Sequence, residues 1–248
     1  MKKIFLLFLM VNSVFGQSFD YKNYSALLKK YVSENGNVNY DKLNQNKTEL
    51  NAVIVQFEKN QPKQNWTKND KMAYYINVYN VFTLKAVVDA YPVKSIKDID
   101  KVWDKNFIAT SKGKISLGDV EHKILRKMDD PRIHFAINCA SFSCPNLLNS
   151  AYLPETLDKQ LENVTKLFIN DKTKNSITAK SASVSEIFNW FAADFKKNGT
   201  VIDFLNKYST IKIDKKAKIM YGYLKGIYLV VKSEAIPSLR CPNREIRT

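Results

Sequence analysis

The chain has 248 residues, 45% hydrophobic and 12% aromatic, which is enough to bury a substantial core as one large domain. Its 39 Lys and Arg residues outnumber its 24 Asp and Glu residues, for a formal net charge of +15. The lysines are scattered singly along the chain, as on a solvated surface. Since there is also no basic helix or nucleic-acid motif, we expect no nucleic-acid partner.

The start of the chain, MKKIFLLFLMVNSVFGQ, has the pattern of a secretory signal peptide. Lys2 and Lys3 precede an apolar run over residues 4–14, which is too short to span a bilayer as an ordinary helix. We expect residues 1–16 to be removed and the protein to be exported to the periplasm or the cell exterior; an uncleaved anchor is the alternative. No second long apolar run follows, so no transmembrane span is expected after cleavage.

Two helices are predicted before the centre of the chain. Tyr24–Ser33 has helical spacing of its apolar residues, and residues 38–40 form an extended entry to a second helix over Leu43–Glu58. A polar loop follows, in which Thr67 or Asn69 can cap the next helix.

The segment MAYYINVYNVFTLKAVVDAY, residues 72–91, is apolar on nearly every side, which predicts a helix at the centre of the domain. Asn77 and Asn80 lie three residues apart and share one face of it. A buried amide without a partner costs about 1–3 kcal/mol, so both need partners nearby. They either bond to neighbouring backbone and tie elements together, or line a polar ligand-binding pocket.

A further helix is predicted over residues 115–128, ISLGDVEHKILRKM. Ser116 and Asp119 form a capping-box pattern at its start. His122 and Arg126 are four residues apart and therefore share a face.

The next segment, RIHFAINC at residues 132–139, is predicted to be a strand that ends in a serine-rich turn. Alternation along a strand places Arg132, His134 and Asn138 on one face and Cys139 on the other. His122 then becomes the more plausible base for Cys139, unless the turn redirects the cysteine.

The remainder of the chain adds a helix over Leu153–Asn170, an aromatic-rich helix in 185–195 and one or two closing strands in 219–231. Several helices with few strands, and no regular βαβ alternation, favour a single α+β domain over residues 17–236, with the helices packed on a small mixed or antiparallel sheet. Residues 237–248 form an arginine-rich tail that we expect to be disordered.

Four blocks, MAYYINVYNVFTLKAVVDAYPVKSI, LGDVEHKILR, DPRIHFAINCASFSCPNL and SEIFNWFAADF, resemble in order and spacing the domain-of-unknown-function family 547. The resemblance covers about Lys71–Phe195 and implies an exported bacterial protein without established activity. The closing segment YGYLKGIYLVV departs from the family, which usually has a YDWSLN-like run there. The polar and sulfur-bearing residues of the blocks are Asn77, Asn80, Glu121, His122, Arg126, His134, Cys139, Ser141 and Cys144.

Three chemistries are open to the cysteine-rich block. Cys139 and Cys144 can form a disulfide in an oxidising compartment. Alternatively Cys139 is a nucleophile whose thiol is activated by His122 or His134. Zinc is the third, but the C-x4-C spacing is wide and no second cysteine pair exists, so we expect neither a metal nor another cofactor.

Two functions follow from these alternatives. One is a thiol-dependent hydrolase or an acyl or amide transferase, with Cys139, His122 and His134 as catalytic residues. The other is an envelope module that binds an anionic small ligand, peptide or polymer through Arg126 and Arg132, with the cysteines in a structural disulfide. A bridged Cys139 cannot be a nucleophile, so the state of the cysteines separates the two. The predicted ligand-binding residues are Asn77, Asn80, Arg126, Arg132, Asn138 and Ser141.

Overall fold

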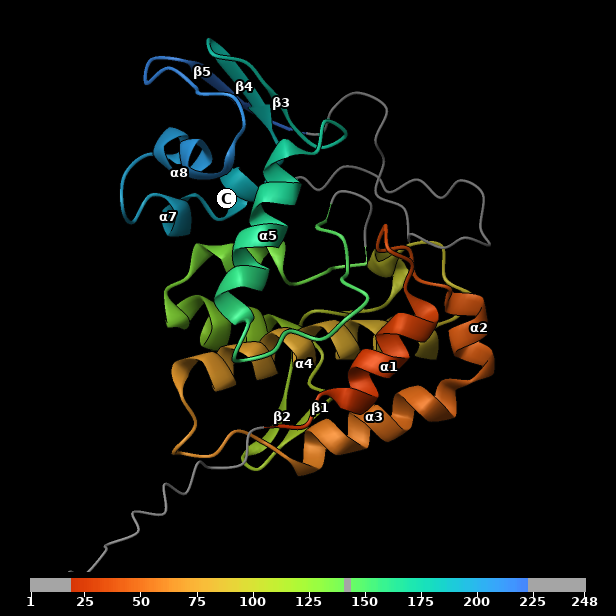
Figure 1. Cartoon of the computed structure of the whole chain (residues 1–248). Coiled ribbons are helices and arrows are strands. Elements are labelled where there is room, and N and C mark those ends of the chain that lie inside the picture. Colours follow the sequence, from red (N-terminus) through yellow and green to blue (C-terminus); the bar gives the residue numbers. More distant parts are fainter. Residues whose placement is uncertain (1–18, 141–143, 223–248) are drawn as a thin grey trace, which may run out of the picture.

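The computed structural model describes residues 19–140 and 144–222 (Figure 1). The predicted signal peptide, Ser141, the tail from residue 237 and most of the predicted closing strands lie outside these residues.

The N-terminal part of the fold is a group of helices that packs around one long central helix (Figure 1). The segment predicted as a single helix over Leu43–Glu58 is two helices, because Asn46 leaves the helical conformation (φ −118°, ψ 32°) and its carboxamide bonds to the Lys42 carbonyl oxygen at 2.9 Å. The helices of this part are α1 (Lys22–Tyr31), α2 (Tyr40–Gln45), α3 (Lys47–Lys59) and α4 (Lys68–Asp89).

Helix α4 is the predicted central helix, and most of its side chains are buried. Of the two candidate caps, Thr67 is the one that is used: its hydroxyl accepts from the Asp70 amide at 3.1 Å, and the Asp70 carboxylate accepts from the Thr67 amide at 2.9 Å. Within the described residues, no helix combines the length and the apolar character needed to cross a membrane.

Asn77 and Asn80 use their carboxamides to hold the backbone of distant segments. Asn77 donates to the Tyr152 carbonyl at 2.8 Å and accepts from the Tyr152 amide at 3.0 Å. Asn80 donates to the Ala136 carbonyl at 3.0 Å and accepts from the Asn138 amide at 2.8 Å. Both asparagines are buried and tie elements together through these bonds, and neither lines the large cavity described below.

The helix predicted over 115–128 is present in an irregular form, as a π-helix η2 (Asp119–Ile124) followed by a 3₁₀ helix η3 (Leu125–Met128). The predicted capping pair is confirmed: Ser116 Oγ accepts from the Asp119 amide, and the Asp119 carboxylate accepts from the Ser116 amide, both at 3.0 Å.

The strand predicted over 132–139 is wrong. Pro131–Phe135 forms a 3₁₀ helix, η4, which Asp130 caps by accepting from the Arg132 amide at 3.0 Å. Alternation was misleading because this segment is buried on all sides, including the consecutive residues from Ile133 to Phe135. The expectation that His134 and Cys139 face opposite ways therefore has no basis.

The strands form two small sheets, so the predicted α+β class is confirmed. Strands β1 (Ile108–Thr110) and β2 (Gly113–Ile115) are an antiparallel hairpin. In the second sheet β4 (Ser181–Val184) pairs antiparallel with β3 (Ser176–Ile177) and parallel with β5 (Lys218–Tyr221). The helices of this half, beside the second sheet in Figure 1, are α5 (Leu157–Asn170), α6 (Ile187–Trp190), α7 (Ala192–Phe195) and α8 (Val201–Tyr208).

An aromatic cluster joins η4 to the C-terminal helices. The Phe135 ring centroid lies 5.0 Å from that of Phe168 on α5, 5.6 Å from Phe188, 5.7 Å from Phe195 and 6.2 Å from Phe204 on α8. Such contacts add to the free energy of burial, and they fix the position of the neighbouring His134.

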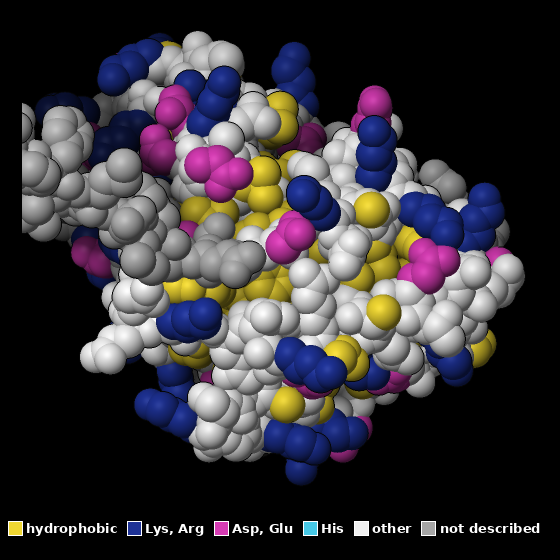
Figure 2. Space-filling model, turned by 60° about the horizontal axis from the view of Figure 1, so that its bottom comes forward, with side chains coloured by type: hydrophobic (Ala, Val, Ile, Leu, Met, Phe, Trp, Pro, Cys, Tyr) yellow, Lys and Arg dark blue, Asp and Glu magenta, His cyan; other side chains and the backbone are white. Residues whose placement is uncertain are grey.

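The surface agrees with the expected distribution of charge. On the face drawn in Figure 2, lysine and arginine side chains are spread apart and interleaved with acidic ones, with apolar side chains between them.

Because Asn80 makes two hydrogen bonds to the backbone, we expect its replacement to lower the stability of the fold strongly. Replacing Asn80 by alanine leaves a buried carbonyl and a buried amide without a partner, which should lower the free energy of unfolding by about 2–4 kcal/mol. Urea denaturation measures this, with the exposed Asn60→Ala on α3's C-terminal cap as the control, expected within about 0.5 kcal/mol of the wild type. Equal losses in the two variants would show that the Asn80 contacts do not stabilise the fold.

Candidate functional site

A cavity of about 580 Å³ lies between α4, η2, the segment around Cys139 and the α6 region. It brings together three residues that the sequence singled out as catalytic candidates, His122, His134 and Cys139. The described residues that line it are Tyr79, Trp103, Asp104, Gly118, Glu121, His122, His134, Ile137, Cys139, Cys144, Pro145, Ile187, Trp190 and Phe191.

Beside this cavity, Asp194 on α7 connects two of the predicted residues. Its Oδ2 lies 2.9 Å from His134 Nε2 and 2.7 Å from Arg126 Nε, and its Oδ1 accepts from Arg126 Nη2 at 3.2 Å. Arg126 Nη1 in turn lies 3.4 Å from Nδ1 of the exposed His122, so these two residues share a face as predicted. The Phe191 ring stacks on His134 with centroids 3.9 Å apart, and the Arg126 guanidinium lies 5.3 Å from the same ring.

The electrostatics of this cluster keep His134 neutral. The bond from His134, together with Arg126, holds the pKa of the Asp194 carboxyl well below its usual range. Burial lowers the pKa of His134, and the bond to Asp194 opposes that shift only in part. An ionised carboxylate can only accept, so Nε2 carries the proton, and Nδ1 presents a lone pair that has no partner among the described residues.

The sequence analysis did not single out Asp194, which lies in the stretch 185–195 that was predicted as an aromatic-rich helix. The signal was available, because Asp194 is the one charged residue in NWFAADF. A carboxylate among aromatic side chains needs a cationic or hydrogen-bonding partner. Its partners, however, lie 60 and 68 positions away in the chain, so spacing could not identify them.

The two arginines are both occupied by carboxylates of the chain itself. Arg126 makes the paired contact with Asp194, and Arg132 contacts Asp130 through Nη2 at 2.7 Å and Asp158 through the same nitrogen at 2.8 Å. Neither arginine lines the cavity. The structure therefore does not bring Arg126 and Arg132 into the cavity that His122 and His134 line.

Cys139 and Cys144 form a disulfide, with their Cα atoms 6.0 Å apart. Asn138 shapes the loop that carries the bridge, since its carboxamide donates to the Pro145 carbonyl at 2.6 Å and accepts from the Ala140 amide at 2.8 Å. Asn138 is not among the residues that line the large cavity. In the bridged protein Cys139 has no thiolate to act as a nucleophile.

A buried lysine supports the same loop. Lys174 Nζ donates to the Cys144 carbonyl at 2.8 Å and lies 5.7 Å from the Phe168 ring centroid. A buried ammonium must be hydrogen-bonded, so this contact anchors the loop to the segment after α5.

The rest of the cavity lining includes aromatic and acidic side chains. Trp103 and Trp190 line the cavity together with the buried Glu121. Burial raises the pKa of the Tyr79 hydroxyl, and the neighbouring charge of Glu121 raises it further, so Tyr79 stays protonated. The two tryptophans were not singled out from the sequence, since nothing local distinguishes them from core residues.

In residues 19–140 and 144–222, no three His, Cys, Asp or Glu side chains are grouped so that they could hold a metal ion.

The fold and the site define an α+β protein with an aromatic-walled cavity beside a charged cluster. Residues 63–169 match the model of the family described as "Protein of unknown function, DUF547". The match confirms the resemblance seen in the sequence. It begins before Lys71 and ends before the aromatic stretch that carries Asp194. No curated protein and no solved structure matches the chain.

The buried His134 predicts a pH dependence of stability. Its pKa in the folded protein lies below the ordinary value of about 6.5, so the unfolded chain takes up a proton first as the pH falls. Stability should therefore decrease on acidification from about pH 7 to 5, and the decrease should be smaller in His134→Gln. Urea denaturation at both pH values measures this, with the exposed His122→Gln as the matched control; an unchanged decrease in His134→Gln would contradict the assignment.

Proposed function

We propose that the protein is an exported module whose large cavity binds a small ligand that carries an aromatic or apolar ring and a positively charged group. The Cys139–Cys144 bridge is then structural. The ligand's charge differs from the anionic ligand inferred from the sequence.

The observation that carries this proposal is the composition of the cavity wall. A volume of about 580 Å³ suits a small organic molecule, and the aromatic side chains of Trp103, Trp190 and Phe191 are part of the lining that an apolar body would contact. Aromatic faces also attract organic cations.

Charge favours a cation over an anion. Glu121 and Asp104 line the cavity, whereas none of the described residues that line it is a lysine or an arginine. An anion would enter beside two carboxylates without a compensating basic group, at a cost in desolvation and repulsion. A cation would be stabilised by the same groups.

The disulfide supports the proposal of export. Disulfides persist in oxidising compartments and are rare where thiols are kept reduced. The bridge thus agrees with the signal-peptide pattern at the start of the sequence.

A titration with phenethylamine, followed by the intrinsic tryptophan fluorescence of the protein, tests the binding proposal. We expect it to change the emission of the protein, and Glu121→Gln to weaken its binding about tenfold, because a hydrogen bond to a charged group is lost. Glu155→Gln, at an exposed position outside the cavity lining, should bind as the wild type does. Trp190→Phe should lose part of the signal, and Trp66→Phe, whose indole lies outside the cavity lining, should keep it.

A parallel titration with 3-phenylpropionate, which has a similar ring and the opposite charge, separates the contribution of the ring to binding from that of the charge. Equal binding of the two probes, or an unchanged affinity in Glu121→Gln, would refute a cation site at Glu121.

A second candidate function is thiol catalysis after reduction of the bridge. One observation favours it: the unpartnered Nδ1 of His134 is buried where His134 and Cys139 line the same cavity, and Asp194 orients the ring from its other nitrogen. Reduction by a dithiol transfers two electrons and two protons to the bridge and leaves the reductant oxidised. The released Cys139 thiol would then pass its proton to His134 and attack an acyl or amide carbon. The C–O or C–N bond of the substrate breaks, the alcohol or amine leaves with the proton from His134, and the acyl group on Cys139 passes to water or another acceptor.

Alkylation with iodoacetamide, read by mass spectrometry, distinguishes the two states. In the untreated, denatured protein Cys139 and Cys144 should remain unlabelled, and both should be labelled after treatment with a dithiol. If His134 activates the thiol, Cys139 in the folded, reduced protein should react more slowly in His134→Gln than in the wild type, with His122→Gln as the control. Labelling of Cys139 without reduction would contradict the bridge, and equal rates in all three proteins would contradict activation by His134.

A further inference from the structure

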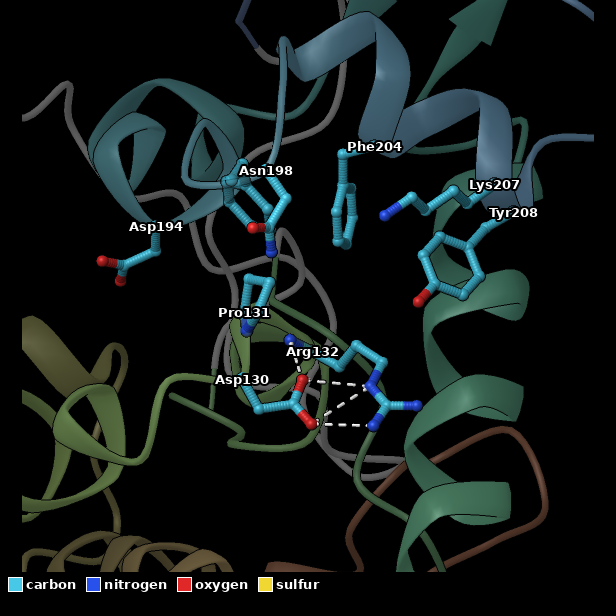
Figure 3. A pocket seen from close by; sticks show the side chains of 9 residues that line it. Asp130, Pro131, Arg132, Asp194, Asn198, Phe204, Lys207 and Tyr208 are labelled. Carbon is cyan, nitrogen blue, oxygen red and sulfur yellow. Dashed lines mark hydrogen bonds and ion pairs between the residues drawn. The ribbon is translucent and has the colours of Figure 1, made fainter.

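A second, smaller cavity of about 170 Å³ lies on the other side of Asp194, between η4, α7 and α8 (Figure 3). It shares Asp194 with the charged cluster but has no lining residue in common with the large cavity. The residues that line it are Asp130, Pro131, Arg132, Asp194, Phe195, Asn198, Phe204, Lys207 and Tyr208.

Its polar groups converge. Figure 3 shows the Lys207 ammonium, the Tyr208 hydroxyl and the Asn198 carboxamide turned toward the space above Pro131 and Arg132. Burial raises the pKa of Tyr208, so its hydroxyl stays protonated and can donate a hydrogen bond. All three side chains can therefore donate into the same space.

The carboxylates in the wall are already neutralised. Asp130 accepts from Arg132 Nε at 3.0 Å and from its Nη2 at 2.7 Å. The Asp194 carboxylate points away from this cavity in Figure 3, and its partners are Arg126 and His134. Neither acid is left to repel an anion in the cavity.

Lys207 supplies a charge that nothing compensates. It is exposed on α8, and it makes no hydrogen bond or ion pair with any residue in the described part of the chain. Of the charged residues that line the pocket, Lys207 is therefore the one that is not already in an ion pair among the described residues. That charge matches a ligand with a single negative charge better than a dianion.

We propose that this small cavity binds a monocarboxylate with a small apolar body, such as an aromatic acid. The carboxylate lies against Lys207 and accepts from Tyr208 and Asn198. The apolar body packs on Phe204 and Pro131. This site is independent of the cation site proposed for the large cavity.

Isothermal titration with benzoate tests the site on the full-length protein. We expect Lys207→Gln to weaken binding about tenfold and Tyr208→Phe to weaken it about threefold, in keeping with one charged and one neutral hydrogen bond. Lys47→Gln, on the exposed face of α3 and outside the pocket, should bind as the wild type does. Lys207 is exposed and unpaired, so its replacement should leave thermal unfolding unchanged, which a melting curve verifies.

Inorganic phosphate, titrated in parallel, tests the specificity for a single charge. We expect it to bind more weakly than benzoate. Absence of benzoate binding by the wild type, equal affinity in Lys207→Gln, or phosphate binding as tight as that of benzoate would each overturn the proposal.

Discussion

The site depends above all on the hydrogen bonds that two carboxamides of α4 make to irregular backbone. The segment that carries His134 and the disulfide is neither strand nor regular helix, so its backbone groups lack the partners that a ladder would supply. Asn80 provides a donor and an acceptor to Ala136 and Asn138. The Asn138 side chain in turn bonds to the Pro145 carbonyl and the Ala140 amide, and so holds the loop that carries the disulfide. A helix whose side chains are mostly buried thereby fixes the geometry of a segment that has little regular structure of its own.

A second constraint is the carboxylate of Asp194, whose side chain is only 12% exposed. A carboxylate in such a position is stable only if its charge is compensated, and breaking a buried pair is far more costly than making it is favourable. Arg126 supplies the compensating charge, and His134 stays neutral, with a buried Nδ1 lone pair that has no partner among the described residues. The same arrangement removes one negative charge from the smaller cavity. The Arg126–Asp194 pair thus affects the small cavity through a neutralised carboxylate in its wall, and the large cavity through His134, which Asp194 holds.

Much of the fold was predictable from local patterns, because these patterns report burial and helical period directly. The central helix, the cap formed by Ser116 and Asp119, and the shared face of His122 and Arg126 all follow from spacing within a few residues. The predicted strand at 132–139 failed because alternation is informative only where one side faces solvent. Buried on every side, the segment was free to form the 3₁₀ turn that Pro131 and its capping aspartate favour.

The sequence by itself determined that α4 lies at the centre of an α+β domain, since a helix that is apolar all round can be stable in water only when other elements cover it. It also identified residues whose side chains can take part in acid–base or thiol chemistry, His134 and Cys139 among them. Only the tertiary structure decided which partners they have: an aspartate 60 positions away for the histidine, and the neighbouring cysteine for the thiol. The physical reason is that hydrogen bonds and ion pairs act over a few ångströms in space, whereas sequence patterns describe only neighbours along the chain.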